Sequence, residues 1–105
     1  MTTKQRAYLK GLAMNMDAIL QCGSIDDISP EFVMAIDEAI EKRELIKIHV
    51  LKKAYGADPK KLGAMMAERS RSELVQVIGN MVVLYRPAKE EKNRKIELPK
   101  EKKKK

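Results

Sequence analysis

The residues most able to do chemistry in this chain surround a glycine turn, Gly23 and Ser24, between an apolar segment and a helix start. Backbone N–H groups at such a turn can bind a phosphate, helped by the positive end of the following helix dipole. A plainer interpretation needs no ligand, because a glycine can end a strand and Ser29 can cap a helix. Asp26 and Asp27 oppose phosphate binding, since a carboxylate about 4 Å from a phosphate costs ~1 kcal/mol in water and several times that in a lower dielectric.

The other reactive residues favour a binding protein over an enzyme. His49 is the one histidine of the chain and Cys22 the one cysteine, so a Cys/His metal cluster cannot form. Asp26 and Asp27 could bind a metal or act in acid–base catalysis, but the sequence offers no third ligand beside them. We find no P-loop, dinucleotide-binding motif or nucleophile elbow. We therefore expect no catalysis, no cofactor and no metal, and we expect Cys22 to be a small core residue.

The charge distribution divides the chain into a body and a tail. The 105 residues carry 22 basic and 15 acidic side chains, a net charge of +7. Residues 89–105 hold nine of the bases and four of the acids, which leaves the body only mildly basic. A basic tail favours polyanions such as RNA, although a merely solvated tail has the same composition. We expect a domain over residues 1–88 and a mostly disordered tail over 89–105, in which 89–99 can still pack on the domain through Ile96 and Leu98.

The sequence carries no membrane or export signal. No apolar run reaches the ~18 residues of a membrane helix, and the first residues, MTTKQRAYLK, lack the apolar stretch of a signal peptide. A single cysteine cannot form an internal disulfide, so a reducing compartment is the default. We expect a cytoplasmic monomer with no membrane partner.

Hydrophobic periodicity and helix-start residues predict three helices and four strands. Ser29 with Pro30, and Asp58 with Pro59, each combine an N-cap residue with proline at the first helical position. Gly79-Asn80 separates two β-rich runs as a two-residue hairpin turn. In chain order, the expected elements are a helix over 3–14, a strand over 17–22, a helix over 30–43, a strand over 44–51, a helix over 59–71, and strands over 74–78 and 81–87.

The element order predicts an α/β fold, a single small domain with a four-stranded mixed sheet and three helices. Two strand–helix–strand units imply parallel strand pairs with right-handed crossovers, and the hairpin adds an antiparallel strand. In the second strand, Ile46, Ile48 and Val50 point to one face while Lys47 and His49 point to the other. We therefore expect this strand to have one buried face.

Three ordered blocks of the sequence resemble the CRM domain, named for chloroplast RNA splicing and ribosome maturation. They are KQRAYLKGLA, SPEFVMAIDEAIEKRELIKI and VQVIGNMVVLYRP, and the resemblance covers residues 4 to about 99. The resemblance implies RNA binding without catalysis or a cofactor. For stand-alone, YhbY-type members in bacteria, it implies association with the precursor of the large ribosomal subunit. For related domains in plants, it implies a role in group II intron splicing. It also implies a fold similar to KH domains and to the C-terminal domain of translation initiation factor three.

The sequence departs from the family pattern at the glycine turn. Family members carry a GxxG loop between the first strand and the next helix, and in KH-type modules such a turn clamps the nucleic-acid backbone. Here Asp26 stands where the second glycine would be, and one residue is inserted before Ile28. Losing that glycine removes easy access to positive φ and to close backbone approach. The resemblance therefore implies a weaker phosphate clamp in this chain.

RNA binding should then depend on basic groups that contact the phosphate backbone. The aromatic content is low, with one Phe, three Tyr and no Trp, so stacking of many bases is not expected. The expected RNA-binding residues are Lys4, Arg6, Lys10, Gly23, Ser24, Lys47, Arg86 and Lys89. The expected partner is precursor large-subunit ribosomal RNA. The alternative is a protein-interaction module, in which the acidic face of the second helix (Asp37, Glu38 and Glu41) docks a basic ribosomal protein.

Overall fold

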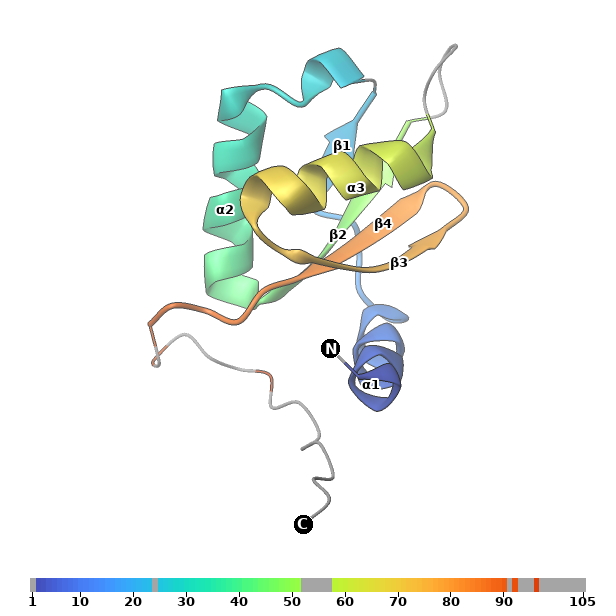
Figure 1. The fold of residues 1–105 in the computed structure, drawn as a ribbon, viewed down its shortest axis with the longest axis vertical. Helices are drawn as coiled ribbons and strands as arrows, with labels where there is room; N and C mark the ends of the chain where they lie inside the picture. The colour runs from blue at the N-terminus through green and yellow to red at the C-terminus, as the bar shows by residue number, and fades with distance from the viewer. Residues whose placement is uncertain (1, 24, 52–57, 91, 93–95, 97–105) are drawn as a thin grey trace.

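The computed structural model describes residues 2–23, 25–51, 58–90, 92 and 96. Its elements are α1 (Thr3–Ala13), β1 (Leu20–Cys22), a short 3₁₀ helix η1 (Ile25–Asp27), α2 (Pro30–Arg43), β2 (Leu45–Val50), α3 (Pro59–Ser70), β3 (Glu73–Ile78) and β4 (Met81–Tyr85). Figure 1 shows how the helices are arranged around the sheet. The predicted α/β fold class, a four-stranded mixed sheet with three helices, is confirmed.

Each helix begins at a side chain that accepts a backbone N–H. Ser29 and Asp58 cap α2 and α3 as predicted, each through a side-chain oxygen. Thr2 and Gln5 form a capping box at the start of α1, in which each side chain accepts the backbone N–H of the other residue. The helix boundaries agree with the predicted ones to within a residue, because these caps are local features of the sequence.

The sheet has the strand order β1-β2-β4-β3. β1 pairs with β2 in parallel, as predicted, with Leu20 opposite Ile48. The second predicted parallel pair is wrong: β2 and β3 run in the same direction, but β4 lies between them and is antiparallel to both. The hairpin returns β4 to the middle of the sheet, where Val82 and Leu84 become fully buried.

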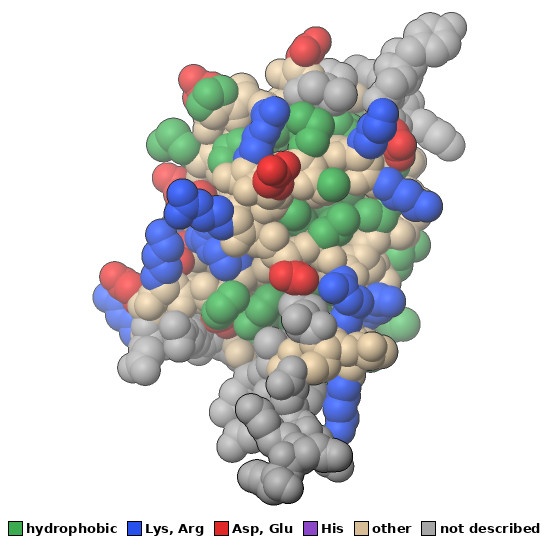
Figure 2. All heavy atoms as spheres, in the orientation of Figure 1, with side chains coloured by type: hydrophobic (Ala, Val, Ile, Leu, Met, Phe, Trp, Pro, Cys, Tyr) green, Lys and Arg blue, Asp and Glu red, His purple; other side chains and the backbone are tan. Residues whose placement is uncertain are grey.

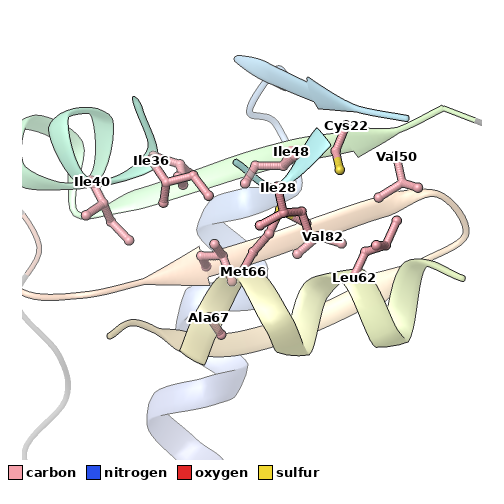
Figure 3. Close-up of a cluster of buried hydrophobic side chains, with 12 residues drawn as sticks. Cys22, Ile28, Ile36, Ile40, Ile48, Val50, Leu62, Met66, Ala67 and Val82 are labelled. Atoms are coloured by element: carbon pink, nitrogen blue, oxygen red, sulfur yellow. The ribbon is translucent and has the colours of Figure 1, made fainter. Parts of the chain in front are cut away.

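Helices cover both faces of the sheet, and each face has its own apolar core. α2 and α3 cover one face, and Figure 3 shows Ile40 and Met66 of these helices on the same side as Ile48 of the sheet. α1 packs on the other face, where Leu9 joins a smaller cluster with Leu45. Burial of each such side chain stabilises the fold by roughly 1.5–3 kcal/mol.

The first two strands differ from their predicted form. The strand predicted over 17–22 begins only at Leu20, because the residues before it connect back to α1 on the other face. In β2, the three residues predicted to face the core are buried, but Leu45 is buried as well. The prediction of one buried face is therefore wrong at the start of β2, because α1 covers the opposite face there.

Three connections meet at one end of the sheet. The backbone N–H of Leu51 donates to the carbonyl of Cys22 at 2.8 Å, and that of Val50 donates to Asn80 at 2.7 Å. The glycine turn after β1, the end of β2 and the β3–β4 turn therefore lie side by side. In the β3–β4 turn Gly79 has a φ of 56°, which favours glycine in a two-residue hairpin.

Candidate nucleic-acid interface

The glycine turn that could bind a phosphate already makes a hydrogen bond to a carboxylate of the same chain. The backbone N–H of Gly23 donates to Oδ2 of Asp27 at 2.8 Å, across the 3₁₀ helix η1. A Cβ placed at Gly23 would lie 2.7 Å from the same oxygen, so a larger residue requires Asp27 to move. Asp26 and Asp27 are both exposed, and their charges repel an approaching phosphate. Ser24 lies outside the described residues.

The predicted RNA-binding residues are divided between the two ends of the sheet. Gly23 lies at the end that holds the β3–β4 turn, as described above. Arg6 bonds to Leu74 near the start of β3, and Arg86 and Lys89 follow β4, so these residues belong to the opposite end. The fold therefore does not bring the glycine turn together with the predicted arginines (Figure 1).

Arg6 is held by the backbone of an edge strand. Its Nη1 donates to the carbonyls of Leu74 at 2.7 Å and Val75 at 2.9 Å, and its Nη2 lies 3.5 Å from Oε2 of Glu73. The pairing of β3 with β4 shifts register between Leu74 and Gln76, so these carbonyls belong to an irregular part of the strand. Arg6 thus joins α1 to β3 where the regular ladder is interrupted.

The predicted lysines fall into two groups. Lys4, Lys10 and Lys89 are exposed, and their side chains make no hydrogen bond or ion pair in the described part of the chain. Lys47 is half-buried, and its Nζ donates to the carbonyl of Met16 at 2.9 Å. Lys47 therefore ties β2 to the segment that follows α1, whereas the other three are available to a ligand.

The side chain of Arg86 is 12% exposed, against 34% for that of Arg6. Its Nη1 donates to the carbonyl of Ser70 at 2.7 Å and lies 2.7 Å from Oδ1 of Asp37. Its Nη2 lies 3.7 Å from Oε1 of Glu41. Arg86 therefore joins the end of β4 to α2 and to the end of α3, and two carboxylates already balance its charge.

Sequence reasoning missed Glu44, a buried carboxylate at the junction of α2 and β2. It is 0% exposed and has a φ of 66°. Its Oε2 accepts the N–H of Ala88 and its Oε1 accepts the N–H of Ile96, each at 2.8 Å. Glu41 accepts the N–H of Lys89 at 3.0 Å. The end of α2 thus holds the segment after β4. No local sequence pattern indicates this, because the residues that donate these hydrogen bonds lie more than 40 residues away along the chain.

The described residues continue past the predicted domain boundary at residue 88. Ile96 is partly buried and packs against the core cluster under α1. Residues 97–105, including Leu98, lie outside the described residues. The prediction of a mostly disordered basic tail stays a prediction.

A cavity of about 280 Å³ lies between α2 and the end of α3. Of the residues that the structure describes, four basic ones line it, Arg69, Arg71, Arg86 and Lys89, and one acidic one, Asp37. In Figure 2, Lys and Arg side chains gather on the left side of the molecule, where the end of α3 meets α2. The residues predicted from the sequence do not include Arg69 and Arg71, although the RSR triplet at the end of the third predicted helix could have indicated them.

Three further observations concern metal binding, the cysteine and membrane-spanning helices. Among them, no group of three or more His, Cys, Asp or Glu side chains could hold a metal ion. Cys22 is 1% exposed within the core under α2 and α3, as predicted. No helix in the described part of the chain is long and apolar enough to cross a membrane.

Comparison with known proteins identifies the family. The chain matches the model of the CRS1 / YhbY (CRM) domain over residues 1–86. A Bacillus subtilis protein named "Probable RNA-binding protein YqeI" is 39% identical over 99 residues, which cover 94% of this chain and 99% of that protein. A Haemophilus influenzae protein named "RNA-binding protein" is 34% identical over 103 residues, which cover 94% and 95% of the two chains. The solution structure of SAV1595 from Staphylococcus aureus has a TM-score of 0.75 and 48% identity, covering 94% of this chain and 99% of that one. The resemblance noted from the sequence is therefore confirmed, and this chain belongs to the CRS1/YhbY (CRM) domain family.

Proposed function

We propose that this protein binds RNA through the phosphate backbone, and that its partner is precursor large-subunit ribosomal RNA during ribosome maturation. The observation that carries the proposal is the family match over residues 1–86, because relatives are named RNA-binding proteins. A net charge of +7 suits a polyanionic ligand. The particular RNA rests on what the family resemblance implies, and we further propose that the protein acts as a cytoplasmic monomer.

Exposed cations without partners in the fold are proposed to make the phosphate contacts. Among the predicted RNA-binding residues, Lys4, Lys10 and Lys89 meet this description. Arg6 and Lys47 would each have to give up hydrogen bonds to backbone carbonyls, and an unpaired buried acceptor costs ~1–3 kcal/mol. We therefore propose that Arg6 and Lys47 position elements of the domain, while the exposed lysines contact RNA.

Backbone recognition also suits the aromatic side chains that the structure describes. Tyr85 is 6% exposed, and Phe32 packs against the core under α2 and α3. Tyr8 is 41% exposed on α1, one turn after Lys4. One exposed tyrosine can stack on one base, so we expect weak sequence preference.

The glycine turn is proposed to contribute little as long as Asp27 occupies it. The N–H of Gly23 is already satisfied by this carboxylate, and a phosphate would have to displace it. A phosphate at the turn would also meet the charge of Asp26. A contact through Ser24 stays a prediction, since that residue is outside the described part of the chain.

The alternative function, docking of a basic ribosomal protein on the acidic face of α2, has less support. Two of the three acidic residues are already used, Asp37 by Arg86 and Glu41 by the backbone of Lys89. Glu38 remains exposed on this face. A basic partner would therefore compete with internal contacts for most of the negative charge.

Recovery of the tagged full-length protein from cell lysate, with and without ribonuclease, tests the proposed partner. We expect precursor large-subunit RNA, identified by sequencing across its processing ends, and we expect ribonuclease to abolish the recovery of ribosomal particles. Ribosomal protein that remains bound after ribonuclease would support the alternative and contradict the proposal.

A further inference from the structure

Arg71 adopts a backbone conformation that favours glycine. It is the C-cap residue of α3, with φ 58° and ψ 40°, and its N–H donates to the carbonyls of Ala67 and Glu68. Glycine is the usual residue at such a left-handed helix end, because a Cβ crowds the following carbonyl. The Arg71 side chain is exposed and makes no hydrogen bond or ion pair within the described part of the chain. The hydrogen bonds of its backbone N–H would form with any residue, so they do not explain why an arginine occupies this position.

Glu44 shows what can offset such a conformation. It is the other described non-glycine residue with positive φ, and its carboxylate bonds to two backbone N–H groups. Arg71 has no equivalent contact with the part of the chain that the structure describes. Residues held in sparsely populated conformations cluster at active sites, ligand-binding sites and switch regions. A ligand-binding site on the surface around Arg71 would account for this backbone conformation.

Arg71 lines the cavity of about 280 Å³ between α2 and the end of α3, which we name the Arg71 pocket. Asp37 is the one acidic residue among the described residues of its lining, and it already pairs with Arg86 at 2.7 Å. Within this described lining, the charges of Arg69, Arg71 and Lys89 are thus left without a carboxylate. Arg69 uses Nη1 for a single hydrogen bond of 3.0 Å to a backbone carbonyl and forms no ion pair with a described carboxylate, so its other guanidinium N–H groups remain for a ligand. Guanidinium groups match phosphate oxygens with paired N–H donors, so this basic side of the pocket suits a phosphodiester.

The opposite side of the pocket is apolar. Val33 and Met34 of α2 line it, and Met34 is 62% exposed. A methionine side chain is polarizable and adapts its shape, and its sulfur makes favourable contacts with aromatic rings. A base that leaves its stack could therefore lie against Met34 while its phosphate contacts the arginines. The cavity is near the lower end of the size range of small-molecule sites, which suits one nucleotide rather than a larger ligand.

A second cavity, of about 290 Å³, extends this surface toward α1. Arg71 and Arg86 line both cavities, and Gln5 of α1 lines the second. The exposed Lys4 precedes Gln5 in α1. An RNA strand that leaves the Arg71 pocket through the second cavity would therefore run toward the lysines proposed above.

We propose that the Arg71 pocket binds one unstacked nucleotide of single-stranded RNA, with its phosphodiester on Arg69, Arg71 and Lys89 and its base against Met34. This inference rests on the proposed RNA-binding function. It adds where on the domain the RNA binds and that the bound RNA is single-stranded.

The test compares wild-type protein with Arg71→Gly and Met34→Ala in fluorescence-anisotropy titrations. The probes are a short fluorescein-labelled single-stranded RNA of mixed sequence and a blunt RNA duplex. We expect Arg71→Gly to bind the single strand about tenfold more weakly, as one charge-assisted contact is lost. Its salt slope on this strand should be smaller by about 0.7. Its melting temperature should rise by a few degrees, because glycine adopts the left-handed conformation without crowding, so the loss cannot come from unfolding.

Met34→Ala should weaken binding of the single strand with an unchanged salt slope, and should leave duplex binding unchanged. Lys42→Gln is the matched control, because Lys42 is an exposed lysine of α2 that stands among acidic residues and does not line the pocket. Arg71→Gly that binds the single strand as tightly as wild type would overturn the pocket while leaving RNA binding intact. Equal losses on single strand and duplex would also overturn it, since they would indicate contact with a helical backbone. A wild-type protein that binds neither RNA would instead overturn the proposed function itself.

Discussion

Replacing Glu44 by glutamine should loosen the segment after β4 from the rest of the domain. The side chain is fully buried, and each carboxylate oxygen accepts one backbone N–H at 2.8 Å, from Ala88 and from Ile96. Glutamine has the same length and the same backbone cost at φ 66°. It replaces one of the two oxygens by an NH₂ group, so one of the two backbone N–H groups must then face another donor.

The expected loss of stability follows from these two hydrogen bonds. An unsatisfied buried donor costs ~1–3 kcal/mol, and the remaining bond loses about 1 kcal/mol when its acceptor is no longer charged. A neutral amide is easier to bury than a carboxylate, which offsets part of this loss. We therefore expect Glu44→Gln to lower the free energy of unfolding by about 2 kcal/mol, which corresponds to a fall in Tm of roughly 8–16 °C for a domain of this size.

Urea unfolding followed by far-ultraviolet circular dichroism measures this change, since the chain has no tryptophan. Glu38→Gln is the matched control, because Glu38 is exposed on the same helix, and it should change stability by less than about 0.5 kcal/mol. Limited proteolysis should cut Glu44→Gln near residues 88–96 faster than it cuts the control. If Glu44→Gln unfolds at the wild-type urea concentration, the carboxylate does not hold this segment and the reasoning is refuted.

Two further predictions concern predicted site residues. Asp27→Asn keeps an oxygen that can accept the N–H of Gly23 and removes one negative charge at the end of the sheet opposite to the Arg71 pocket, so the RNA affinity measured by anisotropy should stay within about twofold of wild type. A fivefold tightening, the equivalent of ~1 kcal/mol, would show that RNA approaches the turn. Arg86→Met removes the bond to the Ser70 carbonyl and should lower stability in urea by ~1–3 kcal/mol. Because Asp37 and Glu41 already balance this arginine, the salt dependence of RNA binding should stay at the wild-type slope, and a smaller slope would show that Arg86 contacts phosphate.

The elements that sequence reasoning placed well are those with local causes. Ser29 with Pro30 and Asp58 with Pro59 cap their helices through oxygens and backbone N–H groups two or three residues apart. Gly79 supplies the positive φ of the hairpin by itself. Such features need no knowledge of the rest of the fold, so the boundaries of α2 and α3 follow from the sequence.

The features that sequence reasoning missed depend on contacts between distant segments. The place of β4 between β2 and β3 is decided by which strand buries Val82 and Leu84, and strand composition does not reveal this. Arg6 looked like a free cation on a basic helix face, but its acceptors are 68 and 69 residues away in β3. Glu44 is only the first residue of the predicted strand over 44–51, and the local sequence does not show its partners, which lie 44 and 52 residues away.

The sequence therefore predicted the kind of ligand better than it predicted the position of the candidate site. The excess of basic residues and the family blocks pointed to RNA, and the exposed Lys4, Lys10 and Lys89 are consistent with that prediction. Charge alone could not separate these lysines from Arg6 and Lys47, because the difference is whether a backbone carbonyl already holds the side chain. The left-handed conformation of Arg71 depends on how α3 ends, which the sequence does not display.

The salt dependence of RNA binding tests the central claim most directly. Five proposed phosphate contacts, at Lys4, Lys10, Arg69, Arg71 and Lys89, predict that log K falls against log salt with a slope of roughly −3.5 for a single strand. Replacing Lys4 and Lys10 together by glutamine should reduce the magnitude of the slope by about 1.4, while Lys42→Gln should leave it unchanged. A wild-type slope near zero, or a Lys4/Lys10 double variant with the wild-type slope and affinity, would contradict the claim that this domain binds RNA through these phosphate contacts.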